Sequence, residues 1–166
     1  MVKNLILVRH AEASESAGGV KDIERELTAK GYRDAPRIGR YLFEQGILPD
    51  KLTSSIARRA QTTAELMAEQ LKYELHKIDL NEDLYNASVR TLLTHVNEAD
   101  DSWNTLLVVG HNPAISYLAE YVSGEEVGSM APAGFAHIQF SVQSWEAVSK
   151  DLGKLMAYHT PENIIF

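Results

Sequence analysis

The sequence predicts an α/β protein, built as a three-layer α/β/α sandwich around a mostly parallel sheet. Two apolar runs, Leu5–Val8 and Leu106–Val109, are bounded by polar or turn residues, as is typical of strands buried on both faces. Segments with helical periodicity alternate with the strands, which favours helices on both sides of the sheet. With 166 residues and 45% hydrophobic content, the chain is expected to form one domain over residues 1–166.

The segment after the first strand is expected to be a loop followed by a long helix. Residues 14–20 are small and glycine-rich, which indicates a loop over the end of the strand. Thr28 can cap a helix over residues 29–45, and Gly46 can end it. Pro36 lies inside this helix and predicts a bend there.

The later elements follow from the same two periodicities, the helical repeat and the alternation of strands. Pro113 is favoured in the first turn of a helix. In order, we expect a strand over residues 51–54, a helix over 56–71, an edge strand over 74–80, a loop over 81–87, a helix from the cap Ser88 to Asn97, a helix over 113–122, and strands over 135–142 and 154–159.

Composition excludes several classes of function. A net charge of −7 and a pI near 5.3 argue against nucleic acid and anionic membrane surfaces as partners, because phosphate backbones require clustered Lys and Arg. The absence of cysteine excludes disulfides, thiol catalysis and cysteine-bound metals. No H-x-x-x-H or aspartate-rich metal motif occurs, and we expect neither metal nor cofactor. No stretch has the length of a membrane span or signal peptide, so we expect a cytoplasmic protein. The sequence is compatible with a monomer and defines no oligomeric state.

Two histidines directly follow the buried strands. His10 comes after Leu5–Val8 and Arg9, and His111 comes after Leu106–Val109 and a glycine. Carboxyl ends of parallel strands meet at one edge of the sheet, where α/β proteins bind ligands. We therefore expect the two imidazoles and Arg9 to converge in one crevice.

A third cationic group is expected at the start of the second helix. This helix opens directly after the strand over residues 51–54, so its first N–H groups and Arg58 would face the same crevice and favour an anion. A guanidinium can bind two phosphoryl oxygens at once. Arg9 and Arg58 are the expected phosphate clamp, and the adjacent Arg59 is expected to be solvated or peripheral.

A neutral imidazole beside such a clamp can attack phosphorus. His10, next to Arg9 in the sequence, is the candidate nucleophile. His111 can donate a hydrogen bond to phosphoryl oxygens as charge accumulates in the transition state.

Four segments, in order, resemble the histidine phosphatase superfamily, and within it the SixA-type phosphohistidine phosphatases. They are Arg9-His10-Ala11, Leu27–Gly31, Ser54–Thr62 of the form S-x-x-x-R-x-x-Q-T, and Gly110–Pro113. The resemblance implies a phosphoglycerate-mutase-like fold and a metal-free reaction. In it His10 takes the phosphoryl group, water hydrolyses the phosphohistidine, and Arg9, Arg58 and His111 complete the phosphate pocket. Glu82 matches the acid that protonates the leaving oxygen in members that hydrolyse esters.

Chain length bears on the substrate that the resemblance implies. Sugar-phosphate mutases carry a lid-forming insertion between the acid and the second histidine, whereas only residues 83–110 separate Glu82 from His111 here. An uncovered site suits a bulky partner, so a protein carrying phosphohistidine is the expected substrate.

Three other interpretations of these residues compete with this one. One is a phosphatase or mutase of the same superfamily that acts on a small phosphate ester. Another is a module that binds phosphohistidine without turnover, although the candidate nucleophile and both arginines are present. The third, a zinc deaminase, would use His10-Ala11-Glu12 but requires a downstream P-C-x-x-C, and the chain has no cysteine.

Overall fold

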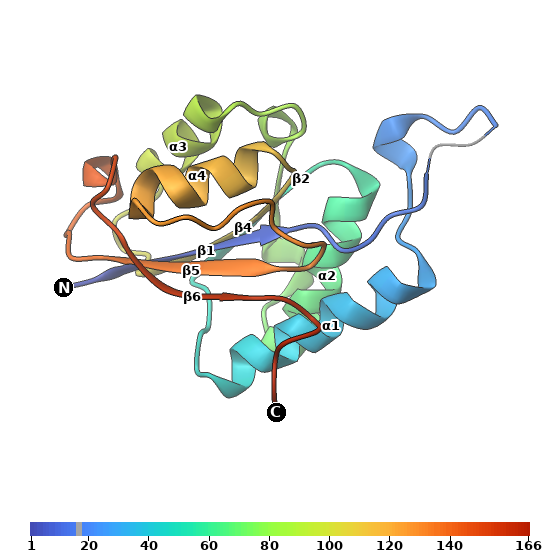
Figure 1. Ribbon diagram of the computed structural model, residues 1–166, viewed down its shortest axis with the longest axis horizontal. Coiled ribbons are helices and arrows are strands. Elements are labelled where there is room, and N and C mark those ends of the chain that lie inside the picture. Colours follow the sequence, from blue (N-terminus) through green and yellow to red (C-terminus); the bar gives the residue numbers. More distant parts are fainter. Residues whose placement is uncertain (16–17) are drawn as a thin grey trace.

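The computed structural model describes residues 1–15 and 18–166 and has a six-stranded sheet in its middle layer (Figure 1). The strand order is β3-β2-β4-β1-β5-β6. Strands β3, β2, β4 and β1 are mutually parallel, and β5 runs antiparallel to β1 and β6. The predicted mostly parallel sheet is confirmed. The strands span β1 Lys3–Arg9, β2 Lys51–Ser55, β3 Asp79–Asn81, β4 Thr105–Gly110, β5 Phe135–Phe140 and β6 Lys154–His159.

Helices cover both faces of the sheet, as the predicted sandwich requires. In Figure 1, α1 (Ala29–Glu44) and α2 (Arg58–Leu71) lie below the sheet, and α3 (Val89–Asn97) and α4 (Ala114–Ser123) lie above it. Four short 3₁₀ turns complete the described elements: η1 Asp22–Glu24, η2 Leu75–Lys77, η3 Glu82–Leu84 and η4 Trp145–Ala147.

The middle of β1 and of β4 is continuously apolar because both faces of these strands are buried. In β1, Leu5 and Leu7 pack in the core cluster that contains α3 and α4. The alternate residues, Ile6 and Val8, pack in the cluster that contains α1 and α2. Since successive strand residues point to opposite faces, the run of four apolar residues serves two cores at once and anchors the sheet edge that follows it.

The start of α1 packs against the segment that follows His10. The Thr28 side chain accepts a hydrogen bond from the Gly31 N–H, which confirms the predicted cap. A Cβ at Gly31 would lie 2.3 Å from the Glu12 carbonyl oxygen, so only glycine permits this close approach. The helix continues through Pro36 without interruption, and Gly46, with φ +74, follows its end.

The predicted edge strand over residues 74–80 is confirmed only at its end, because the edge strand β3 begins at Asp79. Leu75–Lys77 form a 3₁₀ turn, closed by hydrogen bonds from Lys77 N–H to the Glu74 carbonyl and from Ile78 N–H to the Leu75 carbonyl. Strand β3 is therefore confined to Asp79–Asn81. The local turn bonds use the backbone groups that a longer strand would have paired with β2.

Other boundaries also differ from the expected ones, among them the end of β5, at Phe140 rather than at residue 142. Helix α2 begins at Arg58 rather than at residue 56, because Ala57 occupies the cap position and Ser55 Oγ accepts its N–H at 3.2 Å. The expected loop over residues 81–87 contains the turn η3. Within the expected loop over residues 14–20, residues 16–17 lie outside the described residues, and Gly18 and Gly19 both have positive φ.

Candidate active site

The register of the sheet places the two histidines side by side. Strands β1 and β4 are parallel neighbours with Arg9 opposite Gly110, and the His10 N–H extends the ladder to the Gly110 carbonyl at 3.1 Å. The residue that directly follows each strand is a histidine, His10 after β1 and His111 after β4. The imidazole centroids of His10 and His111 are 5.1 Å apart, with the rings tilted by 58°.

The contacts of His10 define which ring nitrogen is free. Its Nδ1 lies 2.8 Å from the Ala11 carbonyl oxygen, and a carbonyl can only accept, so Nδ1 carries the hydrogen. The neutral ring therefore has its lone pair on Nε2. The Ala11 N–H donates to Thr63 Oγ1 at 2.9 Å, which fixes the backbone that orients the ring.

His10 is only 9% exposed. This burial lowers the pKa of His10 to about 3, with the nearby His111, Arg59 and Arg9 acting in the same direction against the hydrogen bond to Ala11. The imidazole is therefore unprotonated at neutral pH, as a nucleophile must be.

His111 is held by the end of strand β2. Its Nε2 lies 2.8 Å from Ser55 Oγ, and the edge of the Tyr85 ring packs on it at a centroid distance of 5.9 Å. Burial, followed by the charge of Arg59, lowers the pKa of His111 to about 4. Both imidazoles at the site are thus neutral near pH 7.

Arg9 has an unsatisfied donor. One terminal nitrogen, Nη1, donates to the Met130 carbonyl at 2.8 Å. The Nε of Arg9 is buried and has no hydrogen-bond partner among the described residues. An unpaired buried N–H of a charged group is costly. The Arg9 residue as a whole is only half-buried, so its remaining terminal N–H groups are the donors left for an anionic ligand at the sheet edge.

Arg59, and not Arg58, is the second arginine beside the histidines. Arg59 is 7% exposed, and its charge lowers the pKa of both His10 and His111. The Arg58 side chain is 58% exposed, with Nη1 3.8 Å from a Glu26 carboxylate oxygen. The expectation that Arg59 would be solvated or peripheral is wrong. The place in the crevice that was expected for Arg58 is taken by Arg59, the next residue along the helix.

Helical periodicity explains this correction and could have revealed it. The buried face of α2 includes Arg59, Thr63 and Met67 at intervals of four, which places them on one stripe of the helix. Arg58 is rotated by about 100° from its neighbour. Extending the apolar stripe of α2 backward from Met67 would have selected Arg59.

Asp22 and Tyr85 are site residues that sequence reasoning missed. Asp22, in η1, accepts from Arg59 Nη2 at 3.1 Å with its carboxylate and from Arg59 Nη1 at 2.7 Å with its backbone carbonyl. Tyr85 and Arg25 also donate to this carboxylate. These bonds, that from Tyr85 foremost, hold the pKa of Asp22 well below its usual range. Asp22 therefore stays ionised and holds Arg59 in place.

Glu82 does not join this group. It opens the turn η3 with an exposed side chain, which forms no hydrogen bond or ion pair with any residue in 1–15 or 18–166. The same turn directs Tyr85, three residues later, to the His111 ring.

The described part of the chain offers neither a metal centre nor a membrane-spanning helix. No group of three or more His, Cys, Asp or Glu side chains in residues 1–15 and 18–166 is arranged to hold a metal ion. Over the same ranges, no helix combines the length and the apolar character that crossing a membrane requires.

The two histidines should titrate far below an ordinary imidazole. In NMR spectra of protein labelled with ¹⁵N-histidine, we expect both rings to stay neutral at pH 5.5, because their pKa values lie near 3 and 4. The variants His10→Gln and His111→Gln assign the resonances. Midpoints near 6.5 for either ring would contradict the buried geometry.

The same shifts make the fold sensitive to acid. A histidine whose pKa is lower in the folded state binds its proton first in the unfolded state, so stability falls as pH drops below about 6.5. Each histidine contributes a slope of up to about 1.4 kcal/mol per pH unit until the folded pKa is reached. Urea unfolding at pH 7 and pH 5 should show this loss, and His10→Gln should reduce it.

The chain is similar to known proteins in sequence and in fold. A family model of the histidine phosphatase superfamily (branch 1) matches residues 5–88. The protein Rv1276c of Mycobacterium tuberculosis (strain ATCC 25618 / H37Rv) is 30% identical over 165 residues, which cover 93% of this chain and 99% of that protein. The SixA protein of Agrobacterium tumefaciens has a TM-score of 0.82 at 24% identity, with 96% of this chain and 98% of that chain covered. A protein histidine phosphatase SixA complexed with tungstate has a TM-score of 0.83 at 20% identity and the same coverage. By its sequence match over half its length and its fold, the chain belongs to the histidine phosphatase superfamily.

Proposed function

We propose that this protein is a phosphatase that removes the phosphoryl group from phosphohistidine on a partner protein, with His10 as nucleophile. The observation that carries the proposal is the neutral His10 ring with a free Nε2, set beside His111 and near the guanidinium groups of Arg9 and Arg59. Membership of the superfamily and the SixA-like fold support it. The absence of cysteine fits a reducing compartment, and we propose the cytoplasm.

In the first step, Nε2 of His10 attacks phosphorus and the bond from phosphorus to the substrate imidazole breaks. The leaving ring keeps the bonding electrons and takes a proton from solvent. The guanidinium groups of Arg9 and Arg59 bind the phosphoryl oxygens, where negative charge is greatest. His111 donates a further hydrogen bond to them. The product is a phosphohistidine at residue 10.

In the second step, water attacks the phosphorus of this intermediate. The bond from phosphorus to Nε2 breaks, its electrons return to the His10 ring, and inorganic phosphate leaves. Ser55 supports this cycle, because its Oγ lies against His111 Nε2 and already accepts the Ala57 N–H. It can therefore give its own hydrogen to Nε2, which leaves the opposite nitrogen of His111 as the donor.

The leaving group in this proposal does not require Glu82. An imidazole leaves with less help from a proton donor than an alkoxide does. The exposed Glu82 carboxylate is bonded to no described group, so nothing holds it as an acid over the phosphoryl site. This favours phosphohistidine over a phosphate ester as substrate.

A comparison of substrates tests the proposal. Turnover is measured side by side on a histidine-phosphorylated protein, a phosphoserine peptide and a sugar phosphate, each with and without a chelator. We expect kcat/KM to be at least about tenfold higher on the phosphohistidine protein, a difference of roughly 1.4 kcal/mol, and to be unchanged by the chelator. Faster hydrolysis of the sugar phosphate would favour the ester alternative, and tight binding without release of phosphate would indicate a binding module.

A further inference from the structure

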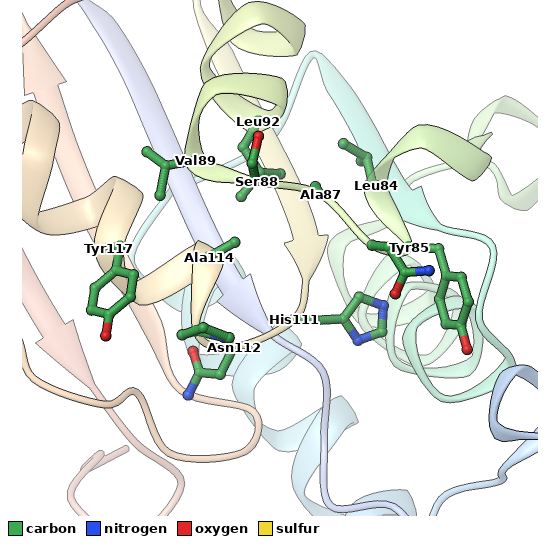
Figure 2. A pocket seen from close by; sticks show the side chains of 12 residues that line it. Leu84, Tyr85, Ala87, Ser88, Val89, Leu92, His111, Asn112, Ala114 and Tyr117 are labelled. Carbon is green, nitrogen blue, oxygen red and sulfur yellow. The ribbon is translucent and has the colours of Figure 1, made fainter.

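A cavity of about 320 Å³ opens beside His111. One wall comes from the loop after η3 and the start of α3, and the other comes from the corner between β4 and α4 (Figure 2). Its volume lies at the lower end of the range of small-ligand sites, roughly 300–1,000 Å³. Its apolar walls are formed by Leu84, Ala87, Val89, Leu92, Pro113 and Ala114.

Among the residues that the structure describes, no charged side chain lines this cavity. Its other lining residues are uncharged polar groups, His111 and two tyrosines, Tyr85 and Tyr117. Figure 2 shows the two tyrosines on opposite sides, with His111 between them and nearer to Tyr85. A sugar would leave many hydroxyl groups against apolar walls, and an anion would find no cation here. A flat ring that is largely apolar fits these walls.

His111 connects this cavity to the candidate phosphate site. The same ring that lines the cavity lies 5.1 Å, centroid to centroid, from His10. A phosphoryl group held by Arg9, Arg59 and the histidines therefore has the cavity next to it. The group attached to the phosphorus must occupy space adjacent to the phosphoryl site while the attacking and leaving atoms remain roughly in line.

The hollowed surface continues past Tyr117. A second hollow of about 240 Å³ shares Asn112, Pro113 and Tyr117 with the first and extends along α4. The carboxylate at its edge, on Glu120, already accepts the N–H groups of Val127 and Gly128 at 2.7 and 2.8 Å. The Tyr117 side chain between the hollows is 57% exposed. Such a continuous surface matches a ring carried on a protein segment better than an isolated small molecule.

We propose that the cavity beside His111 is the leaving-group subsite, and that it holds the imidazole ring of the substrate phosphohistidine and an apolar side chain next to it. This inference rests on the proposed function. It adds the residues that select the leaving group, which are distinct, His111 apart, from those that bind phosphate. In the first step, the bond to the substrate nitrogen breaks inside this cavity, and the freed ring departs along the surface by Tyr117.

The test compares two substrates that share the phosphoryl group and differ in the ring. The leaving group of phosphoramidate is ammonia, which is too small to fill the cavity. The leaving group of free N-phosphohistidine is an imidazole ring, which can fill it. The variant Ala87→Phe fills the cavity, and Tyr117→Ala, at an exposed position, removes part of its wall. We expect the loss of kcat/KM in Ala87→Phe to be roughly tenfold larger for phosphohistidine than for phosphoramidate. In Tyr117→Ala we expect the loss for phosphohistidine to be about threefold larger than the loss for phosphoramidate.

The matched control is Thr94→Phe. Thr94 lies on the same helix, α3, but faces a separate hollow with Arg90 and His95, and it should change neither ratio. Equal losses on both substrates in Ala87→Phe and Tyr117→Ala, with wild-type protein that still hydrolyses phosphohistidine, would overturn the subsite alone. Wild-type protein that hydrolyses neither substrate but does hydrolyse sugar phosphates would overturn the subsite and the proposed function together.

Discussion

Replacing His10 with alanine is expected to abolish both turnover and the covalent phosphoenzyme. Removal of a nucleophile that no neighbour can replace costs at least about 10³-fold in kcat. Although His111 is only 5.1 Å away, its Nε2 is engaged by Ser55, so we expect no substitution of one ring for the other. Incubation with ³²P-labelled phosphohistidine protein, followed by rapid quenching, measures the intermediate directly.

The chemistry of the label identifies the bond. Phosphorus bound to a ring nitrogen gives a product that is labile in acid and stable in base. His137→Ala serves as a control, because that imidazole is half-buried and lies 2.8 Å from Asn4 Oδ1, near the start of β1 and away from the end of the strand that carries His10. If the His10→Ala variant melts at the wild-type temperature and still acquires the label, His10 is not the nucleophile.

The two adjacent arginines are expected to behave very differently. Arg59→Ala should lower kcat by about 10² to 10³-fold, the usual cost of losing a charged or polar donor to a developing anion. Arg58→Ala should change kcat by less than about threefold, because its side chain lies 58% exposed near Glu26, where an ion pair contributes little. Steady-state kinetics on the same phosphohistidine substrate measures both.

Lysine at position 59 provides the sharper test. Lysine keeps the charge but cannot bind two phosphoryl oxygens at once, or both the carbonyl and the carboxylate oxygen of Asp22. The kcat of Arg59→Lys should therefore be little higher than that of Arg59→Ala. Circular dichroism and melting curves show whether each variant is folded. Should Arg58→Ala be the damaging change and Arg59→Ala the harmless one, the orientation of α2 described above would be incorrect.

The sequence predicted the centre of the molecule well. Short apolar runs such as Leu5–Val8, bounded by polar or turn residues, are typical of a strand covered on both faces, which is how this run is buried. Once two such strands are parallel neighbours, His10 and His111 must meet at one edge. The predicted sandwich and the meeting of the histidines depended only on these strong local patterns.

The sequence was less informative where the deciding contacts are distant. The edge strand over residues 74–80 rested on weak alternation, and turn bonds inside Leu75–Lys77 prevailed. The link from Asp22 to Arg59 and Tyr85 joins three separate segments of the chain, and none of them carries a local signal of the other two. The choice between Arg58 and Arg59, in contrast, can be made from the sequence, because Arg59 shares the four-residue spacing of the buried Thr63 and Met67.

The ladder between β1 and β4 has a consequence for how this protein can change. Interstrand spacing, about 4.8 Å, is a constant of backbone geometry, and it sets how far apart His10 and His111 stand. The residues around the neighbouring cavity come instead from a connecting segment and a helix start. Grafting a different segment over residues 86–92, with Tyr85 kept in place beside Asp22 and His111, could thus redirect the protein toward another substrate while its reaction centre stays intact. In this fold, the paired strands fix the spacing of the reacting histidines, and a separate segment of the chain lines the cavity beside them.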